Sequence, residues 1–326
     1  MPVCFHAPGS GHECVSTEIP ATMPPGVVWI DLFQPTPTEV HAVEKLVGVE
    51  LPTSEEMREI ESTSRLYCEH GARFMTTPLL VSTESDSPHA TEIGFVFVGA
   101  YLVTLRWEDT QSFRLIAAQF DRRALVTRDQ AFIALVESIV DRQADLLERI
   151  SKETEELSQR IFTRIQAAKE SEKNLREAIY RLGRSGGLIT QHRECIVALS
   201  RLVQYASHED FDEPNPGRAS TLYPRLKPVA RDLQSLSEFG GFLSNKINFM
   251  LDATLGLINI EQNSIVKIFT VAAVIFLPPT LVASLYGMNF EHMPELKWQW
   301  GYPFSIVLMI ASVIVPFVFC RRKGWL

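Results

Sequence analysis

Apolar residues are concentrated near the end of this chain rather than spread evenly along it. From Ile268 to Phe290, about 23 residues, and from Gly301 to Cys320, about 20 residues, no side chain carries a charge. Each stretch is long enough to cross a hydrocarbon layer of roughly 30 Å at about 1.5 Å per residue. The pattern therefore predicts two transmembrane helices, both in the C-terminal part of the chain.

Basic residues indicate how these helices are oriented. Lys297 is the only Lys or Arg in the segment between them, whereas Arg321, Arg322 and Lys323 directly follow the second stretch. Because cytoplasmic flanks carry the excess of Lys and Arg, we expect both termini to be cytoplasmic. The N-terminus has neither the basic start nor the apolar core of a signal peptide, so the first 260 or so residues are expected to stay inside. The chain is predicted to be a multi-pass protein of the plasma (inner) membrane.

Residues 26–130 alternate short strand patterns with short helical ones, which is typical of a small cytoplasmic α/β domain. VVWIDL, from position 27, has the pattern of a buried strand, and Thr36, Pro37 and Glu39 form the start of a capped helix. ARFMTTPLLV and EIGFVFVGAYLVTLRW predict further strands, the second broken at Gly99 into a hairpin. The sequence shows no Gly-rich phosphate loop, no Ser/His/Asp set at a recognisable spacing and no nucleotide fingerprint, so we do not expect an enzyme.

Residues 131–225 have the pattern of a helical hairpin followed by a loop. Between Glu137 and Glu156 there are seven acidic and three basic side chains. They form either a solvated helix face with i,i+4 pairs or a surface that attracts cations near a pore mouth. The loop HEDFDEPNPG, at 208–217, is either simply solvated or holds a divalent ion among its acidic residues Glu209, Asp210, Asp212 and Glu213.

Residues 226–286 are predicted to form one very long helix, because no proline lies between Pro228 and Pro278. Apolar residues recur at the spacings of a packed helix seam, at Val229, Leu233, Leu236, Leu243, Ile247, Met250, Ile258 and Ile265. About 60 helical residues measure about 90 Å, and the bilayer accounts for only about a third of this length. The rest is expected to be a cytoplasmic stalk, in which Gly240 and Gly241 mark either a bend or a close helix contact.

The first 25 residues are rich in proline and are expected to be a mobile tail. Within CFHAPGSGHEC, the residues Cys4, His6, His12 and Cys14 have the spacing C-x-H-x5-H-x-C and side-chain types that suit Zn²⁺. The spacing is not that of a standard zinc finger, so a metal site and a disordered tail both remain open. The five cysteines are scattered and odd in number, which predicts no disulfide framework in a reducing compartment.

The stretch YGMNFEHMPELKW, which begins at Tyr286 directly after an apolar helix, resembles the CorA family of divalent-cation (magnesium/cobalt) transporters. The order of elements agrees with this family over nearly the whole chain. The resemblance implies a CorA-like pentameric funnel with an α/β cytoplasmic domain, a long helical stalk and two C-terminal transmembrane helices. It divides the membrane part into the stalk and first span at 226–286, an outer loop at 287–301, a second span at 302–320 and a basic cytoplasmic C-terminus at 321–326.

The resemblance also implies residues for the ion path. It places the selectivity filter at Gly287, Met288 and Asn289, where five Asn289 carbonyls would face hydrated Mg²⁺, an ion that dehydrates reluctantly. The implied pore-lining residues fall within an arc of about 120° at 100° per residue. These are Asn263, Val266, Phe269, Leu277 and Thr280. The alternatives are that the apolar members face neighbouring helices, and that Gly-Met-Asn is only a helix C-cap with Gly at C′.

Glu291 and Glu295, just beyond the filter, either attract cations to the pore mouth or pair with Lys297 and cap the loop. The sequence departs from the family pattern with Phe269 at a usually aliphatic site and with a second proline, Pro279, beside Pro278. A carboxylate that senses internal Mg²⁺ in some members is not carried over, because that position is Pro228.

The leading hypothesis is a channel or transporter for divalent cations, Mg²⁺ first and Co²⁺ or Ni²⁺ next, with no cofactor besides the transported ion. Its expected partners are four further copies of the chain, the lipid bilayer and divalent cations, and no nucleic acid. A proton-coupled zinc transporter of the ZntB type shares these elements and is the alternative. A membrane scaffold that keeps the fold and does not conduct is the third possibility.

Overall fold

The computed structural model describes residues 3–8, 12–15, 19–59, 61–83, 88–164, 172–207, 222–288, 293 and 298–324. The chain divides into two compact units. The larger contains Met1–Glu170 and Arg176–Leu251, and the smaller contains Ser171–Leu175 and Asp252–Leu326. One helix, α7 (Leu222–Tyr286), contributes to both units.

The larger unit contains a seven-stranded mixed sheet with the strand order β2-β1-β3-β7-β6-β5-β4. The strands are β1 (Val3–His6), β2 (His12–Val15), β3 (Trp29–Phe33), β4 (Leu66–Glu69), β5 (Ala72–Val81), β6 (His89–Val98) and β7 (Tyr101–Arg106). Strands β3 and β7 are parallel, and the other described neighbours are antiparallel. The strands predicted within 27–32 and on both sides of Gly99 are confirmed, and Gly99 turns the chain with a φ of 49°.

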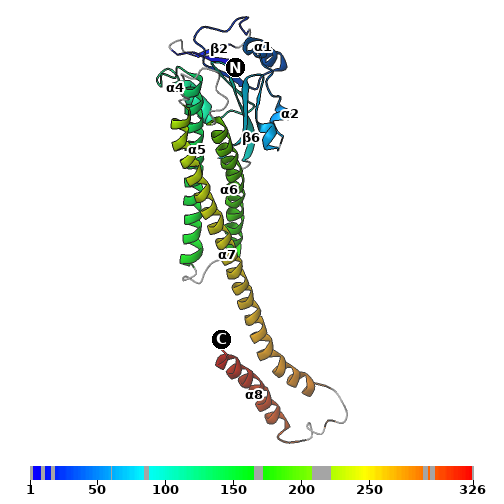
Figure 1. Cartoon of the computed structure of the whole chain (residues 1–326). Helices are drawn as coiled ribbons and strands as arrows, with labels where there is room; N and C mark the ends of the chain where they lie inside the picture. The colour runs from blue at the N-terminus through cyan, green and yellow to red at the C-terminus, as the bar shows by residue number, and fades with distance from the viewer. Residues whose placement is uncertain are drawn as a thin grey trace. The chain divides into compact units, whose positions relative to one another are not determined.

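Helices cover both faces of this sheet (Figure 1). The short helices α1 (Pro37–Val47) and α2 (Ser54–Met57) bury Val43 and Met57 on one face. The other face packs against α4 (Gln111–Gln119), α5 (Arg128–Arg164), α6 (Glu172–Ala206) and the beginning of α7. A one-turn helix, α3 (Ser62–Arg65), precedes β4. The predicted α/β domain is therefore confirmed as a three-layer arrangement, and the capping box of α1 is present.

The N-terminal residues form a hairpin, so the expected mobile tail is wrong for Val3–His6 and His12–Val15. Strand β1 pairs with both β2 and β3. Its alternate residues Val3 and Phe5 are buried in the sheet core at 0% and 2% exposure. The burial of these two side chains stabilises the hairpin, although four residues were too short a pattern to stand out in the sequence.

A buried ion pair joins the two parallel strands. Arg106 on β7 donates from Nη2 to Asp31 Oδ2 on β3 at 2.8 Å, and its Nε lies 3.2 Å from both carboxylate oxygens. Thr104 Oγ1 donates to Asp31 Oδ1 at 2.7 Å, and Trp29 Nε1 donates to Thr104 Oγ1 at 2.9 Å. The guanidinium also lies over the ring of Phe33, 4.4 Å from its centroid. Each buried charge thus has a partner and several hydrogen bonds, the condition under which such a pair is tolerated.

Helices α5, α6 and α7 lie side by side below the sheet (Figure 1). The predicted seam of α7 is buried at Val229, Leu233, Leu243, Ile247 and Met250. A Cβ at Gly240 would meet Arg193 Cγ of α6 at 3.4 Å, and α7 continues through this position as helix. Gly240 therefore marks a close helix contact, one of the two alternatives that the sequence left open.

His192 of α6 is fully buried in this bundle. Its Nε2 donates to the carbonyl oxygen of Gln143 on α5 at 3.2 Å, and Nδ1 has no hydrogen-bond partner among the described residues. Burial lowers the pKa of His192 to about 4, and the hydrogen bond to Gln143 only partly opposes this. The imidazole is therefore neutral in the folded chain at neutral pH.

We expect Arg106→Leu to lower the free energy of unfolding by about 3–5 kcal/mol, because Asp31 would remain buried without its partner. Arg114→Leu is the matched control, since Arg114 pairs with Asp109 but its side chain is 67% exposed. The control should lose no more than about 1 kcal/mol. Thermal unfolding of the full chain in detergent measures both. Equal losses would show that the buried pair contributes no more than a surface pair.

The low pKa of His192 predicts a loss of stability in mild acid. The unfolded state binds a proton near the ordinary pKa of 6.5 and the folded state only near about 4, so stability falls as the pH drops between these values. At about pH 5 the loss should be about 2 kcal/mol. The change in melting temperature between neutral pH and about pH 5 should be smaller for His192→Gln than for the unchanged chain. The same change in both proteins would contradict this assignment.

Candidate functional site: the two apolar helices

The smaller unit contains two helices that are long and apolar enough to cross a membrane. They are the C-terminal part of α7 and α8 (Gly301–Arg322). In the most apolar 18-residue stretch of each helix, only 6% of the residues of the first and 11% of those of the second are buried. The core helix of a soluble protein would be mostly buried, so these surfaces require lipid or other protein chains around them.

The two helices are joined at one end by a polar contact. Lys267 Nζ of α7 donates to the carbonyl oxygen of Gly324, just after α8, at 2.9 Å. Arg321, Arg322 and Lys323 lie next to Gly324 in the sequence. The basic side chains at the start of the first apolar helix and at the end of the second therefore belong to the same end of the helix pair.

At the opposite end, α7 finishes in a tight turn at Gly287. Its amide donates to the carbonyl oxygen of Ala283 at 2.9 Å, and the amide of Met288 donates to that of Leu285 at 3.4 Å. Gly287 does not adopt a positive φ, which argues against the simple C-cap alternative. A Cβ here would instead lie 3.1 Å from the Ala283 carbonyl oxygen, a tight contact, so the close approach of the backbone favours glycine.

The five expected pore-lining residues are all exposed in the single chain. Val266, Phe269 and Leu277 are 62%, 72% and 66% exposed. Other apolar side chains of the same helix, such as Ile268 and Phe276, are equally exposed. Exposure thus leaves this stripe available to an ion path, while its assignment to the pore is what the family resemblance of the sequence implies.

The hydroxyl of Thr280 has a defined hydrogen bond. Its Oγ1 donates to the carbonyl oxygen of Phe276 at 2.7 Å. Because the hydroxyl proton is used inside the helix, Oγ1 offers only lone pairs to the surroundings. Such an oxygen can accept hydrogen bonds from the water shell of a cation.

Three of the predicted functional residues, Asn289, Glu291 and Glu295, lie outside the described residues. The acidic loop at 208–217 also lies outside them. Met288, the middle residue of the expected filter, is described and 42% exposed.

A stripe of aromatic side chains on α7 was not anticipated from the sequence. Phe239, Phe242 and Phe249 are 37%, 58% and 63% exposed. They fall within an arc of about 80° at 100° per residue, and Phe239 and Phe242 stack on each other. The signal was their spacing of three and seven, which the stronger buried seam of the same helix obscured.

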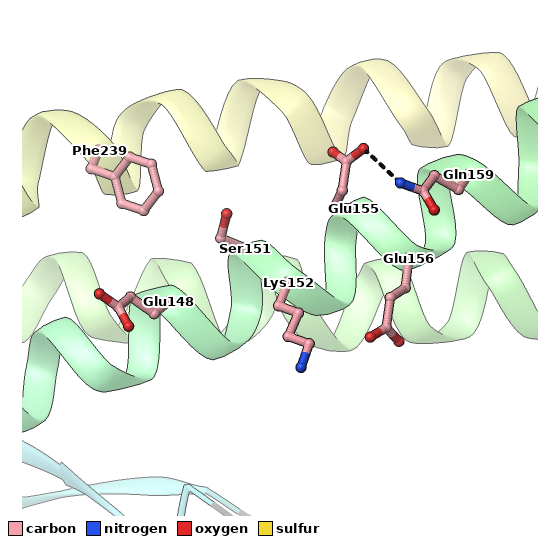
Figure 2. A pocket seen from close by; sticks show the side chains of 7 residues that line it. All are labelled: Glu148, Ser151, Lys152, Glu155, Glu156, Gln159 and Phe239. Carbon is pink, nitrogen blue, oxygen red and sulfur yellow. Dashed lines mark hydrogen bonds between the residues drawn. The ribbon is translucent and has the colours of Figure 1, made fainter.

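The acidic face of α5 is partly neutralised by neighbouring helices. Glu153 accepts from Arg181 of α6 at 2.9 Å, and Glu155 accepts from Lys246 of α7 at 2.6 Å. The hydrogen bond from Lys246 lowers the pKa of Glu155. Figure 2 shows the open groove beside this pair, of about 410 Å³, where Phe239 lies across from a row of α5 side chains. These ion pairs support the interpretation of a solvated, salt-bridged helix face.

The N-terminal Cys/His residues are only partly described. Cys4 is disulfide-bonded, contrary to the expectation that the cysteines form no disulfides, while Cys68, Cys195 and Cys320 are free. Burial raises the pKa of the Cys195 thiol to about 12, so it is not a nucleophile. Among the residues with described side chains, no group of three or more His, Cys, Asp or Glu is placed to hold a metal. The side chains of His12 and Cys14 lie outside that set.

Comparison with known proteins places the chain in context. The family model described as "CorA-like Mg2+ transporter protein" matches residues 25–322. The "Magnesium transport protein CorA" of Salmonella typhimurium is 33% identical over 301 residues, which cover 92% of each chain. The CorA magnesium transporter from Methanocaldococcus jannaschii covers 100% of this chain and 99% of its own, with a TM-score of 0.73 and 18% identity.

The ZntB cytoplasmic domain from Vibrio parahaemolyticus is a further structural neighbour. It covers 79% of this chain and 98% of its own, with a TM-score of 0.58 and 10% identity. At such identities the two structural likenesses show the fold alone.

Proposed function

The chain belongs to the family of CorA-like Mg²⁺ transporters, and we propose that it conducts hydrated Mg²⁺ across a membrane through a pore formed by five copies of itself. The family is one of transporters and not of enzymes. The observation that carries the proposal is the exposed stripe on α7, which runs from Asn263 to Thr280 and leads to the turn at Gly287.

One chain with two spanning helices cannot enclose a water-filled path. Copies of α7 arranged around an axis would place Val266, Phe269 and Leu277 in successive apolar rings that close the pore by dewetting. The aromatic stripe at Phe239, Phe242 and Phe249 supports the same association, because exposed aromatic side chains on one helix face are typical of contacts between chains.

The proposed filter lies at Gly287, Met288 and Asn289. Mg²⁺ holds its water at about 2.0–2.1 Å and releases it slowly, so an entry site works best by accepting hydrogen bonds from that water. Asn289 would supply a neutral carbonyl oxygen from each chain, strong enough to select the ion and weak enough to let it leave. The crowding between a Cβ at position 287 and the Ala283 carbonyl oxygen supports a turn that favours glycine there.

The polar stations inside the path would be Asn263 and Thr280. Because the Thr280 hydroxyl proton is used by the Phe276 carbonyl, its oxygen suits the donating water shell of a cation. Glu291 and Glu295, near the outer mouth, would raise the local cation concentration, an effect that salt weakens.

For the orientation, we propose that both termini face the cytoplasm. Lys267 and the basic residues at the end of α8 belong to the same end of the helix pair, which matches the excess of positive charge on cytoplasmic flanks. The Gly-Met-Asn turn then faces the outside.

A proton-coupled zinc transporter is the second candidate. The fold likeness to the ZntB cytoplasmic domain and the N-terminal Cys/His residues favour it. Family membership and the curated relative named as a magnesium transport protein favour Mg²⁺. A scaffold that does not conduct would have the same helices and no metal flux.

We expect native mass spectrometry in mild detergent to show a particle of five chains, each of 36.8 kDa. The physical reason is that one chain with two spanning helices cannot surround the stripe on α7, so several chains must enclose it together. Spectra that contain only monomers and dimers would contradict the shared pore.

Asn289→Ala should reduce Mg²⁺ uptake into liposomes by about tenfold or more, equivalent to at least about 1.4 kcal/mol in the barrier to conduction. The variant removes one acceptor per chain at the proposed filter, while the turn is set by Gly287, so oligomer size and melting temperature should stay unchanged. Asn248→Ala, an exposed position of α7 in the larger unit, is the control and should transport normally.

Asn289→Asp should bind Mg²⁺ more tightly and pass it more slowly, because each added charge strengthens attraction to a divalent ion. Uptake of Mg²⁺ and of Zn²⁺ is measured with and without a pH gradient. Zn²⁺ uptake that requires the gradient would favour the zinc transporter, and no flux of either ion would favour the scaffold. If Asn289→Ala carries Mg²⁺ at the unchanged rate, the proposed filter is wrong.

A further inference from the structure

The end of the helix pair that carries the basic residues is held together by a hydrogen bond between the helices. Lys267 Nζ of α7 donates to the carbonyl oxygen of Gly324 at 2.9 Å, and the amide of Gly324 donates to the carbonyl oxygen of Arg321 at 3.1 Å. Val271, one turn after Lys267, is 5% exposed, and Cys320 is 2% exposed. The burial of these two side chains, on helices that are otherwise open, indicates that α7 and α8 cover each other at this end.

The last turn of α8 divides its three exposed basic residues between two sides of the helix. The burial of Cys320 marks the side that faces α7. At about 100° per residue, Arg321 and Lys323 lie about 100° and 60° to either side of Cys320. They border the junction with α7, as Lys267 does. Arg322 lies about 160° from Cys320 and so faces away from the junction.

The junction concentrates positive charge. Lys267, Arg321 and Lys323 form no ion pair within the described part of the chain. The nearest acidic residue before Lys267 on α7 is Glu261, about 9 Å away along the helix axis. Lys267 uses one of its three N–H donors on Gly324 and keeps two. The same bond offsets the partial negative charge of the α8 C-terminus, which would otherwise repel an anion.

The opposite end of α8 indicates the depth of this junction in a bilayer. Trp300 and Tyr302 are 67% and 77% exposed, and such side chains are enriched at the boundary between lipid and water. From Tyr302 to Arg321 the helix measures about 29 Å at about 1.5 Å per residue, close to the roughly 30 Å of the hydrocarbon layer. With the aromatic end at one boundary, Arg321 lies at the level of the phosphate groups of the other leaflet.

Apolar surface adjoins the junction on its membrane side. Phe319 lies about 40° from Lys323 around α8 and is 58% exposed. Val315, one turn further into the membrane, is 67% exposed. A ligand that fits both the cations and this surface carries a phosphate next to long hydrocarbon chains.

We propose that the junction of α7 and α8 binds the phosphodiester headgroup of an anionic phospholipid through Lys267, Arg321 and Lys323. The acyl chains of the lipid lie along Phe319 and Val315. Arginine presents paired N–H donors to a phosphate, and the two lysines supply compact positive charges. Because the lipid contacts both helices, it holds the start of the apolar part of α7 against the end of α8.

This inference rests on the membrane position of the two helices and goes beyond the proposed ion path. It applies whichever ion the chain carries and does not require a particular number of chains. Lipid binding is measured without transport, so a failure of Mg²⁺ uptake and a failure of lipid binding are separate results.

The test uses the full chain in mild detergent, freed of native lipid and titrated with dioleoylphosphatidylglycerol or dioleoylphosphatidylcholine. Native mass spectrometry counts the lipids retained by each chain. One phosphatidylglycerol per chain should be retained, at least about fivefold more tightly than phosphatidylcholine, because only the former carries a net charge. Phosphatidylglycerol should also raise the melting temperature, since it binds the folded chain.

Arg321→Gln and Lys323→Gln should each weaken phosphatidylglycerol retention by about fivefold, the effect of one cation at an anionic lipid surface. Arg322→Gln is the matched control, because it removes the same charge from the opposite side of α8, and it should change retention by less than about twofold. Lys323→Arg keeps the charge and should bind as the unchanged chain does. This variant covers the case in which Lys323→Gln disturbs the end of the helix.

Equal losses in all three glutamine variants would show general attraction to positive charge and overturn the site. Equal retention of the two lipids would overturn it as well. Inorganic phosphate in large excess should not displace the lipid, because it has no acyl chains to contact Phe319. Displacement by phosphate would identify a site for free anions and overturn the assignment to a lipid.

Discussion

Uncovered apolar surface on two helices is the constraint on which the rest of this structure depends. Phe269, Phe276 and Leu281 are 70% or more exposed on α7, and Val307 and Val315 on α8 are 63% and 67% exposed. At roughly 25 cal/mol for each Å² of apolar area, exposure of such a surface to water is costly. Lipid or other protein chains must cover it.

The larger unit buries its apolar side chains between its own sheet and helices. Its sheet has helices on both faces, and its central parallel strands are joined by the Asp31–Arg106 pair with Thr104 and Trp29 around it. The apolar seam of α7 is buried in the same way as far as Met250, whereas Ile265 of that seam is 47% exposed. A single continuous helix thus changes its surroundings from protein neighbours to an open surface.

Much of the fold could be predicted from patterns that repeat over many residues. The strands around Gly99, the capping box at Thr36 and the continuity of α7 all follow from periodicity or local hydrogen-bond chemistry. The hairpin of β1 and β2 could not, because four residues carry too little periodicity and pairing with β3 is a long-range event. The disulfide of Cys4 was missed as well, because a count of cysteines does not tell which of them are bonded.

The candidate site was predictable to a different degree. The motif at Gly287 pointed to a glycine requirement, but the cause is contact with the Ala283 carbonyl oxygen and not a left-handed φ. The stripe at Asn263–Thr280 is implied by the resemblance to the family, and its exposure in one chain does not test it, because a pore face and a lipid face are equally exposed there. The aromatic stripe at Phe239 was overlooked since it shares a helix with a stronger apolar seam.

The ion pair between the parallel strands also bears on how the chain acquires its fold. Asp31 and Arg106 are 75 positions apart, whereas β5, β6 and β7 follow one another in sequence and pair in that order. Local hairpins form quickly, and a contact across such a separation must first overcome the entropy of closing a long loop. We therefore expect the docking of β3 against β7 to be the slow step.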